Sequence, residues 1–579
     1  MRLYSPAMFF ALALALSFAA FSLTAQTYYG TIRGTVMDTT GAVSPAVEVT
    51  ITNLETNISQ KVTSNEVGNY VAPNLIPGRY QVSAEKSGFK KFVAEDIQLG
   101  AMADRRVDVR LEVGAVTESV QVTAGAQLIE TERATISDVK SNYVFSNMAV
   151  VSNYRSIWRM LALTPGVAGD GTHYAGATPG RNATYSIDGM PIRDGWSGSS
   201  FGPALTYLDS YREFRVDLVS VIASGGTSAN IAVVSESGTN SYHGEAWLHY
   251  NAIGTTARPF FAPTSPAGPP IFRPNFKLGG PVWLGKVYNG RDRTFFHFSW
   301  QGLRGSQTPY VTNIAVPTQP FRDGDFSAVS ARILDPLNNQ PFAGNRIPSA
   351  RISPVSRYYQ ENYYPLPNSG TDRFTAITTF PNASNQYTVR GDHKINSANS
   401  LFGRFMYQRY EFERWDGGNN PKIGIYNQWR YQVHAVLSDT HVISPSMLNE
   451  FRFGYARDSS IYGGSLRGLD VVKASGLQLA DLQDVKGLPS VNITGFSSIY
   501  QGDENGWMWS NFHLLDTLHW TRGKHNVRFG FDRSKYNGRQ FATSPSAVYG
   551  VYGFNGRFSG NPYSDFLLGV MDSSARSTS

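Results

Sequence analysis

Short stretches of alternating apolar and polar residues recur along the chain and predict β-strands. The clearest lie in the second half, at residues 401–408, 449–455 and 526–532. Side chains of a strand point alternately to opposite faces, so each stretch has two different faces. One face holds Leu401, Gly403, Phe405, Tyr407, Phe451, Phe453, Tyr455, Val527, Phe529 and Phe531. The other holds Phe402, Arg404, Met406, Gln408, Glu450, Arg452, Gly454, Asn526, Arg528, Gly530 and Asp532.

Residues 27 to about 112 form a compact strand-rich block. Alternating runs such as "TIRGTVMD", "VEVTITN" and "RYQVSAEK" are separated by turn sequences such as "TTGAVSP", "SNEVG" and "LIPG". Gly, Pro and Asn in these separators supply the backbone angles that tight turns need. Six or seven strands at this spacing predict a β-sandwich.

The block from residue 126 to about 243 mixes helical and strand patterns. The stretch "NYRSIWRMLALTPGV" predicts a short helix that ends at its Thr-Pro-Gly. Its apolar residues at helical spacing are Ile157, Met160 and Leu161. In "ATYSIDGMPIRD" we predict a hairpin with Asp188 and Gly189 at the turn, because both accept positive φ angles. The stretch "DSYREFRVDLVSV" predicts a strand in which Phe214 and Val216 alternate with charges.

Between these two blocks lies "TESVQVTAG", residues 117–125, whose alternation predicts a strand with Val120 and Val122 on one side. It lies between "LEVGAV" and the charged run "IETERATISD", so no partner strand is within hairpin reach. The backbone of an unpaired strand can pair with a strand of another protein. The alternative is that this stretch is the last edge strand of the sandwich, or a linker.

The N-terminus has the organisation of a secretory signal. Arg2 precedes the apolar run "AMFFALALALSFAAF", and Ala25 in "SLTAQ" offers a small residue for cleavage. A competing cleavage site ends at Ser22. A spanning helix needs roughly 20 apolar residues, which is more than this run contains. No other run of that length occurs, so any membrane spanning has to use strands.

Composition favours a multidomain β-protein and excludes several chemistries. The 579 residues exceed the size at which single cores stop growing, roughly 250–300 residues. Charged residues make up 16%, aromatics 13%, and the 55 Gly and 30 Pro suit short strands joined by turns. The net charge of +7 comes from Lys and Arg scattered singly, so no nucleic-acid partner is expected. Without cysteine, the chain can form no disulfide, thiolate metal site or cysteine nucleophile.

Motifs for catalysis or metal binding are incomplete. The spacing from Gly280 to Lys286 in "GGPVWLGKV" matches a phosphate-binding loop, but Val287 replaces the hydroxyl that should reach Mg²⁺. A turn is the favoured interpretation there. His243 and His249 fall on one strand face without a third ligand nearby. No nucleophile elbow or pair of catalytic carboxylates stands out. We therefore predict a protein that is not an enzyme, with no cofactor and no metal site.

The alternating stretches of the second half fit an outer-membrane barrel better than a soluble sandwich, although both have a period of two. The secretion signal and the many Tyr and Phe residues, 31 and 34, suit a barrel with aromatic girdles. Long polar insertions at about 304–384 and 458–507 suit large extracellular loops.

Two resemblances add a family to this interpretation. Residues 68–70, "GNY", with 75–82, "LIPGRYQV", resemble the carboxypeptidase regulatory-like domain, a transthyretin-like fold related to carbohydrate-binding modules. The block 126–243, followed by "FKLGGPVW", "RTFFHFSWQGLR", "VPTQPFRDGDFS", "NRIPSARISPVS" and "RGKHNVRFGFD" in that order, resembles TonB-dependent outer-membrane receptors of the Oar-like branch. The likeness covers nearly the whole chain. One departure is "SANIAVVSESGTN", which replaces a glycine-rich, Lys-bearing stretch.

The resemblance implies an all-β protein: a transthyretin-like β-sandwich, an α+β plug domain and part of a transmembrane antiparallel β-barrel. The implied segments are a signal peptide 1–25, the sandwich 26–112, a TonB-box segment 113–125, the plug 126–243 and barrel strands 244–579. Within that segment, the residues that resemble the box are Thr117, Glu118, Ser119, Val120, Gln121, Val122, Thr123 and Ala124.

The same resemblance implies a function in the bacterial outer membrane, in contact with its lipid. TonB, energised by its inner-membrane complex, pairs with the box and drives uptake of an unidentified extracellular ligand, with a glycan or oligosaccharide among the candidates. Two other functions compete with this interpretation. One is an outer-membrane structural or adhesion protein without transport, and the other is a carbohydrate-binding surface protein.

The end of the chain departs from the family pattern. Nine or ten strand candidates follow residue 244, whereas such barrels have about 22 strands. An open sheet leaves backbone groups unpaired in lipid, and a barrel of ten strands is too narrow for the plug. The final "GVMDSSARSTS" lacks a terminal aromatic residue. We therefore expect these residues to be the N-terminal part of a longer chain.

Overall fold

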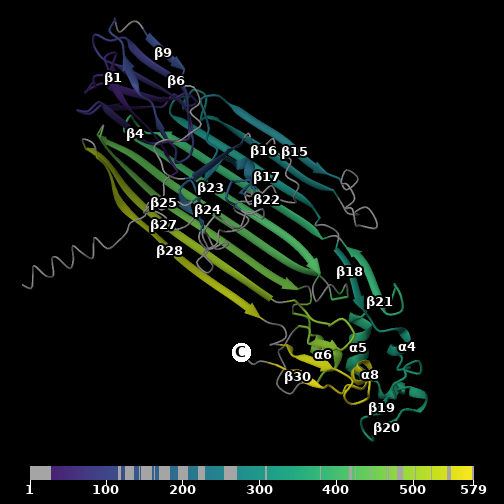
Figure 1. Cartoon of the computed structure of the whole chain (residues 1–579). Coiled ribbons are helices and arrows are strands. Elements are labelled where there is room, and N and C mark those ends of the chain that lie inside the picture. The colour runs from purple at the N-terminus through teal and green to yellow at the C-terminus, as the bar shows by residue number, and fades with distance from the viewer. Residues whose placement is uncertain are drawn as a thin grey trace, which may run out of the picture.

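The computed structural model arranges the chain around one long sheet with a domain at each end (Figure 1). A sandwich lies at one end, and a domain of helices and short strands, called the cap below, lies at the other. A smaller sheet, called the plug sheet below, packs against the long sheet. The described residues are 28–576 apart from 115–118, 124–135, 143, 145–159, 162, 168–182, 193–206, 219–228, 253–269, 307–309, 379, 416–419, 421, 424, 445, 465, 467, 479–486, 503, 523–524 and 544–548.

The sandwich packs two sheets over one apolar core. One has the order β4-β1-β7, with β8 also pairing with β1, and the other has the order β3-β2-β5-β6-β9. Tyr70 and Tyr80 are buried, and their hydroxyls donate to the carbonyls of Val107 and Ile76, both at 2.6 Å. The predicted β-sandwich is confirmed. Its strands are β1 (Gly30–Asp38), β2 (Glu48–Asn53), β3 (Ser59–Thr63), β4 (Asn69–Leu75), β5 (Gly78–Glu85), β6 (Lys91–Leu99), β7 (Asp104–Arg106), β8 (Val109–Leu111) and β9 (Ser119–Thr123).

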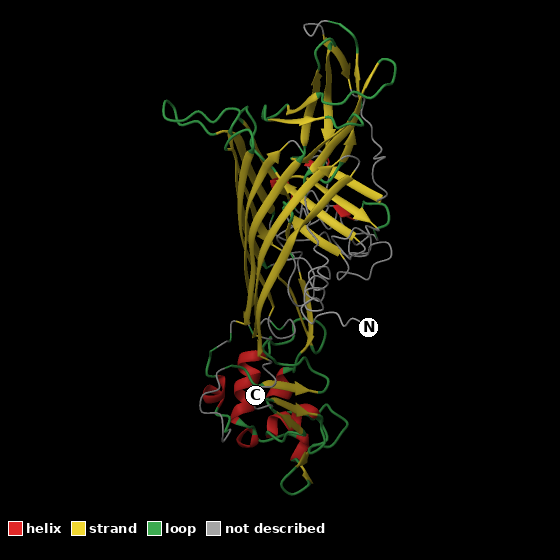
Figure 2. Ribbon diagram, turned by 90° about the vertical axis from the view of Figure 1, so that its left-hand side faces the viewer, coloured by secondary structure: helices red, strands yellow, loops and turns green. Residues whose placement is uncertain are grey.

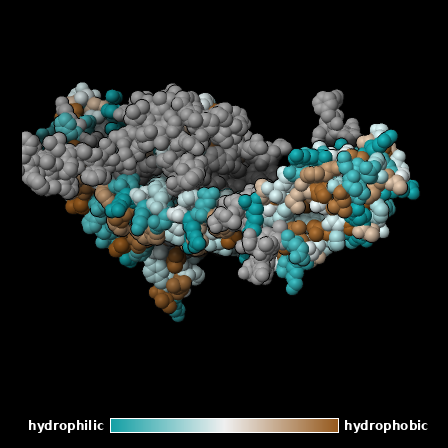
Figure 3. All heavy atoms as spheres, turned by 90° about the horizontal axis from the view of Figure 1, so that it is seen from below, coloured by the Kyte–Doolittle hydropathy of each residue, from teal (hydrophilic) through white to brown (hydrophobic). Residues whose placement is uncertain are grey.

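The long sheet is an antiparallel meander of nine strands within the described ranges. The longest, β24, has 20 residues, which exceeds the roughly 9 to 11 that cross a bilayer. Phe405, Phe453 and Phe529 are exposed on one face, while Arg404 and Arg452 are buried on the other, as the alternation predicts. In Figure 3, hydrophobic and hydrophilic residues are interspersed over the described surface in view. The strands are β15 (His243–Asn251), β16 (Ile271–Pro281), β17 (Thr294–Ser306), β22 (Pro381–Lys394), β23 (Asn399–Trp415), β24 (Ile425–Ser444), β25 (Met447–Gly464), β27 (Glu504–Arg522) and β28 (His525–Thr543).

The plug sheet has the order β10-β13-β14-β11-β12, and its short strands lie beside the long ones (Figure 2). Phe214 and Val216 enter a core shared with the long sheet. The charged residues that alternate with them on β13 are buried as well, because the sandwich covers that face: Arg215 Nη1 donates to the Ala101 carbonyl at 3.2 Å. Met160 and Leu161 join the core, whereas Ile157 lies outside the described residues. The elements are β10 (Ile136–Ser141), β11 (Ala183–Ile187), β12 (Met190–Pro191), η2 (Leu208–Ser210), β13 (Tyr211–Leu218) and β14 (Ala229–Ser235).

The cap is assembled from three chain segments, which follow β17, β25 and β28. Their buried residues, such as Phe326, Val491 and Tyr563, form one apolar cluster. The insertions predicted as extracellular loops are therefore a folded domain. Among the described helices, none is long and apolar enough to cross a membrane. The cap contains β18 (Tyr310–Ala315), α4 (Gln319–Arg322), β19 (Leu334–Asp335), β20 (Gln340–Pro341), η4 (Ala343–Asn345), η5 (Ser349–Arg351), α5 (Pro354–Tyr363), β21 (Arg373–Thr378), α6 (Val471–Ser475), β26 (Ser490–Ile493), β29 (Val551–Phe554), α8 (Pro562–Leu568) and β30 (Ser573–Ala575).

Candidate functional site

The turn between β11 and β12 carries the plug sheet into close contact with the long sheet. Asp188 and Gly189 form this turn with φ angles of 48° and 72°, as the hairpin pattern predicts. A Cβ atom at Gly189 would overlap the guanidinium of Arg452 on β25. Likewise, a Cβ at Gly454 would overlap the side chain of Met190. Glycine on both sides therefore permits the close approach of the plug sheet and the long sheet.

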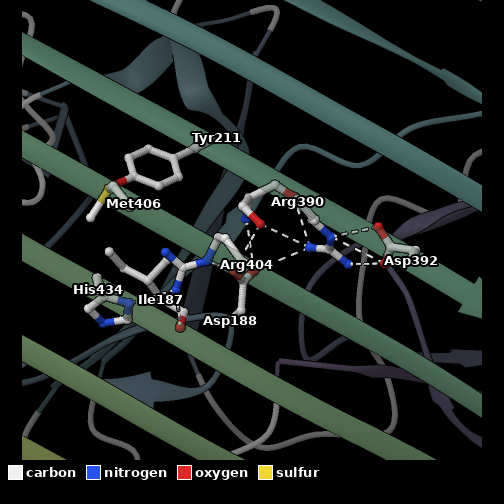
Figure 4. Close-up of polar contacts among 9 residues, drawn as sticks. Ile187, Asp188, Tyr211, Arg390, Asp392, Arg404, Met406 and His434 are labelled. Atoms are coloured by element: carbon white, nitrogen blue, oxygen red, sulfur yellow. Dashed lines mark hydrogen bonds and ion pairs between the residues drawn. The ribbon is translucent and has the colours of Figure 1, made fainter.

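The carboxylate of Asp188 is buried and receives hydrogen bonds from both sheets (Figure 4). From the plug sheet, the backbone N–H and the hydroxyl of Ser235 donate to it at 2.9 and 2.8 Å. From the long sheet, Arg404 Nε donates at 2.5 Å, and Arg390 Nη1 lies 3.5 Å away. Arg404 Nη2 also lies 2.8 Å from His434 Nδ1. This carboxylate thus joins three strands of two different sheets.

Further charges surround Asp188 in the same buried layer. Arg390 donates to Asp392 at 2.8 and 2.9 Å and lies 4.6 Å from the Phe402 ring centre. Arg452 contacts Glu450 and stacks 5.7 Å from the ring of Tyr28, at the start of the sandwich. The full cluster, called the ion cluster below, is Asp188, Asp392, Glu450, Arg390, Arg404 and Arg452. Its formal charges cancel.

The surroundings of Asp188 fix its protonation state. Burial by itself raises the pKa of this carboxyl, but the guanidiniums of Arg404 and Arg390 and the hydrogen bonds from Ser235 outweigh burial and hold the pKa below its usual value. Asp188 is therefore ionised at neutral pH. Removing one member of a buried ion pair is costly because its partner stays charged and unpaired. The chemistry of this cluster is therefore suited to holding the plug sheet against the long sheet.

A second polar contact joins the sandwich to the plug sheet. Glu55 accepts two hydrogen bonds from Arg212, both of 2.8 Å. The Ala101 backbone N–H donates to the buried carboxyl of Glu213. Burial raises the pKa of Glu213, although that N–H and the neighbouring Arg212 and Arg215 lower it. A cavity of about 130 Å³ lies close by, lined by residues of the sandwich, of the ends of long-sheet strands and of the turn between β22 and β23.

Part of the predicted TonB box is found in the sandwich. Ser119–Thr123 form β9, which pairs in parallel with β6 and ends its sheet. Val120 lies opposite Phe92, and Val122 lies opposite Ala94. Thr117, Glu118 and Ala124 lie outside the described residues. The arrangement matches the edge strand named as the alternative above, and a role in binding TonB stays a prediction.

The other sequence candidates lie on β15, an edge strand of the long sheet, and in the turn after β16. His243 and His249 are exposed on the same face of β15. In the part of the chain that the structure describes, no group of three or more His, Asp or Glu side chains could hold a metal ion. The stretch with phosphate-loop spacing is the turn between β16 and β17, with Lys286 at its tip. The interpretation of this stretch as a turn is confirmed.

Reasoning from the sequence missed the ion cluster as a site. Arg404, Arg452 and Glu450 were placed correctly on the polar face of their strands, and Asp188 was placed correctly at a turn. No periodic signal links a turn to strands more than two hundred residues away. A signal was present in the charged residues themselves, because charge on the inner face of a membrane strand needs a partner in the lumen.

Comparison with known proteins gives a consistent family. Residues 234–579 match the model of the outer membrane beta barrel domain, and residues 31–112 match the carboxypeptidase regulatory-like domain. The TonB-dependent transporter Oar of Myxococcus xanthus is 29% identical over 198 residues. That match covers 32% of this chain and 18% of the transporter, so the matched part spans less than a fifth of the length of its relative.

Solved structures of outer-membrane receptors align with lower similarity. The outer membrane transporter YddB of Escherichia coli aligns at 8% identity with a TM-score of 0.44, covering 72% of this chain and 50% of that chain. A mutant of the ferric enterobactin receptor PfeA of Pseudomonas aeruginosa aligns at 10% identity with a TM-score of 0.40, covering 71% and 50%. The family model spans more than half of the chain, and the chain therefore belongs to the outer membrane β-barrel domain family, is a homologue of a TonB-dependent transporter and resides in the bacterial outer membrane.

Proposed function

We propose that this protein is a TonB-dependent transporter that takes up an extracellular ligand, with residues 126–243 as its plug. The observation that carries the proposal is the ion cluster, in which Asp188 of the plug hairpin meets Arg390 and Arg404 of the long sheet. Such contacts hold a plug in place at rest, yet they can be exchanged for water when the plug is pulled. Ligand binding at the cap end and force at the sandwich end then act on the same plug.

TonB is the partner in this proposal, and β9 is the strand that it pairs with. Among the described residues the sheet ends at β9, so the second edge of this strand is available to a strand of another protein. Backbone hydrogen bonds across that edge are the usual means of strand addition. Force on β9 then reaches the plug through the chain that leads from residue 123 to β10.

Uptake measurements test the proposal. A ligand-depletion screen that includes oligosaccharides compares the parent strain with a knockout of this protein, and the depleted compound is then followed in a strain without TonB. Uptake should stop in both strains. Uptake that continues without TonB contradicts the proposal.

Proline substitutions in β9 test the partner. Successive N–H groups of a strand point to opposite edges, so Val120 and Val122 share one edge while Gln121 serves the other. Proline removes the N–H donor at its position. Val120→Pro and Gln121→Pro should therefore separate pairing with β6 from pairing with TonB, with one variant abolishing uptake while the amount in the membrane is unchanged. If uptake survives at both positions, the box lies elsewhere.

The cap supports a second candidate function, a surface structural or adhesion protein without transport. Its three chain segments share one apolar core, so it is a folded domain. Under this alternative, the knockout strain differs from its parent in cell attachment and takes up every screened compound as the parent does.

A further inference from the structure

The turn between β16 and β17 exposes an unusual group of apolar side chains. Trp283 is 62% exposed, Leu284 61% and Val287 88%. All three lie within five residues. Single exposed apolar residues are ordinary, but a contiguous group marks a surface that meets another phase or partner.

This turn has a defined conformation that holds the three side chains outward. The N–H of Leu284 donates to the Tyr288 carbonyl at 2.9 Å, and that of Val287 donates to the Leu284 carbonyl at 3.1 Å. Gly285 at the tip has a φ of 58°, which glycine adopts without strain. The folded turn therefore leaves these three side chains exposed.

The base of the turn is fixed to the rest of the protein. The Asp292 side chain accepts from Asn57 of the sandwich at 3.0 Å and from Asn240 at 2.5 Å. Arg293 donates to the carbonyls of Lys394 and Ile395 in the neighbouring turn, at 3.3 and 3.2 Å. The tip therefore has a fixed position relative to the barrel rim.

The side of the membrane follows from the lengths of the connections. At the sandwich end, short turns join β22 to β23, β24 to β25 and β27 to β28, whereas the long cap segments leave the other end. Outer-membrane barrels have short periplasmic turns and long extracellular loops. The turn that carries Trp283 thus lies at the periplasmic rim.

The apolar group continues the lipid-facing side of the barrel. Phe272, Phe276 and Leu278 on β16 are 39%, 40% and 37% exposed and share one face, opposite the buried Arg273 and Asn275. That face meets lipid in a barrel of the outer membrane. Immediately beyond the end of β16, the chain presents Trp and Leu, which are typical of the interface between acyl chains and headgroups.

We propose that this turn anchors the barrel rim in the periplasmic leaflet, with Trp283, Leu284 and Val287 among the acyl chains. Lys286 lies between the apolar residues at the tip and is exposed. Its ammonium group binds lipid phosphate, with anionic headgroups preferred. A shared apolar and basic tip fits an anionic bilayer surface and does not fit the aqueous periplasm.

Site-specific fluorescence tests the proposal, because the chain has no cysteine and a single introduced thiol is unique. The full-length protein with Val287→Cys carries an environment-sensitive label in vesicles of phosphatidylethanolamine and phosphatidylglycerol. The control is Leu337→Cys, an 80% exposed apolar residue in the turn between β19 and β20 of the cap. Spin-labelled lipids should quench the label at 287 about threefold more than the label at 337, and aqueous iodide should show the opposite order.

Two further variants make the result specific. Trp283→Ser with Leu284→Ser, in the labelled background, should bring the label at 287 into water. Lys286→Glu should reduce lipid quenching in vesicles that contain phosphatidylglycerol and leave it unchanged in zwitterionic vesicles. Equal iodide quenching at 287 and 337 overturns the proposal. Protection from both quenchers overturns it too, because a protein then covers the turn.

Discussion

The sandwich and the cap lie at opposite ends of the long sheet and are attached to it in different ways. The sandwich is one continuous stretch of chain with its own core. It is joined to the plug sheet by polar contacts such as Glu55 with Arg212, and by Tyr28, Tyr29 and Ala101, which are buried in the core of the plug sheet. The cap is built from three separated segments that grow out of barrel strands and share one apolar core. The sandwich can therefore separate from the plug with its core intact, whereas the cap cannot separate from the barrel without breaking its own.

This difference assigns different mechanical roles to the two ends. If a partner pulls on the sandwich, as proposed above, the polar contacts and the few apolar residues that join it to the plug sheet yield before the larger apolar core of the cap does. The ion cluster around Asp188 lies between the two ends and combines both properties, because its charges are fully buried. The predictions below test this order of strengths, from the largest expected effect to the smallest.

Asp188→Asn should cause the largest loss, about 3–5 kcal/mol in the free energy of unfolding of the plug. The substitution leaves Arg404 and Arg390 buried without the carboxylate that both of them face. Urea unfolding monitored by protease sensitivity of the plug measures the loss. Glu48→Gln is the control, because its ion pair with Lys61 is exposed to solvent and should contribute little to stability. Equal stability of the two variants would show that the ion cluster does not stabilise the plug sheet.

Leu567→Ala in the cap should cost about 2–5 kcal/mol, and the damage should stay in the cap. Leu567 on α8 is fully buried in the core that joins the three segments. Limited proteolysis should cut the variant in the cap while the sandwich and plug stay protected. The matched control is Leu337→Ala, which removes an exposed leucine and should change nothing. Fragmentation that reaches the sandwich would show that the two ends are not independent.

Glu55→Gln should weaken the attachment of the sandwich by about 1–2 kcal/mol without unfolding it. The substitution removes the charge that binds both Arg212 nitrogens, while the sandwich core is untouched. The distance between spin labels on the sandwich and the barrel rim should become more broadly distributed. Glu48→Gln, on the same domain, should leave the distribution narrow. A narrow distribution in Glu55→Gln would mean that other contacts hold the sandwich.

The sandwich and the cap also differ in how far the sequence predicts them. Strands such as β5 and β6 are neighbours in the chain, so a period of two and a glycine turn were sufficient to predict the sandwich. The cap core joins Phe326, Val491 and Tyr563, which are separated along the sequence by several barrel strands. Periodicity carries no information about which distant segments meet, so these insertions were taken as loops. The same reason hid the partner of β9, since a parallel neighbour needs a long connection rather than a hairpin.

The sequence predicted the two parts of the candidate site separately, but not their contact. Inward charges on β23 and β25 followed from the alternation, and the tight turn at Asp188 followed from its Asp-Gly pair. Their meeting depends on how the plug sheet docks, which is a property of shape and burial. The sequence therefore predicts which residues need partners in the lumen, and the structure supplies the partners.

The smallest expected effect is a difference in pH response between the two ends. At the sandwich end, burial raises the pKa of Glu213, so the folded state binds a proton more readily than the unfolded chain. The contribution of Glu213 to stability is fully present below the ordinary glutamate pKa and is lost as pH rises through the raised value. At the cap end, the hydrogen bonds from Arg351 lower the pKa of Asp335. Its contribution is present above the ordinary aspartate pKa and is lost as pH falls through the lowered value.

Acidification from neutral pH should therefore strengthen the sandwich contact before it weakens the cap. Unfolding of each end, followed by a label placed in that domain, measures the two responses separately between about pH 7 and pH 3. Glu213→Gln should flatten the response of the sandwich end only, and Asp335→Asn should flatten that of the cap only. The charged neighbours of Glu213 are Arg212, Arg215 and Glu236. A response of the same sign at both ends would show that the attachments are electrostatically alike, and the proposed division between a releasable and a resistant end would then rest on apolar burial alone.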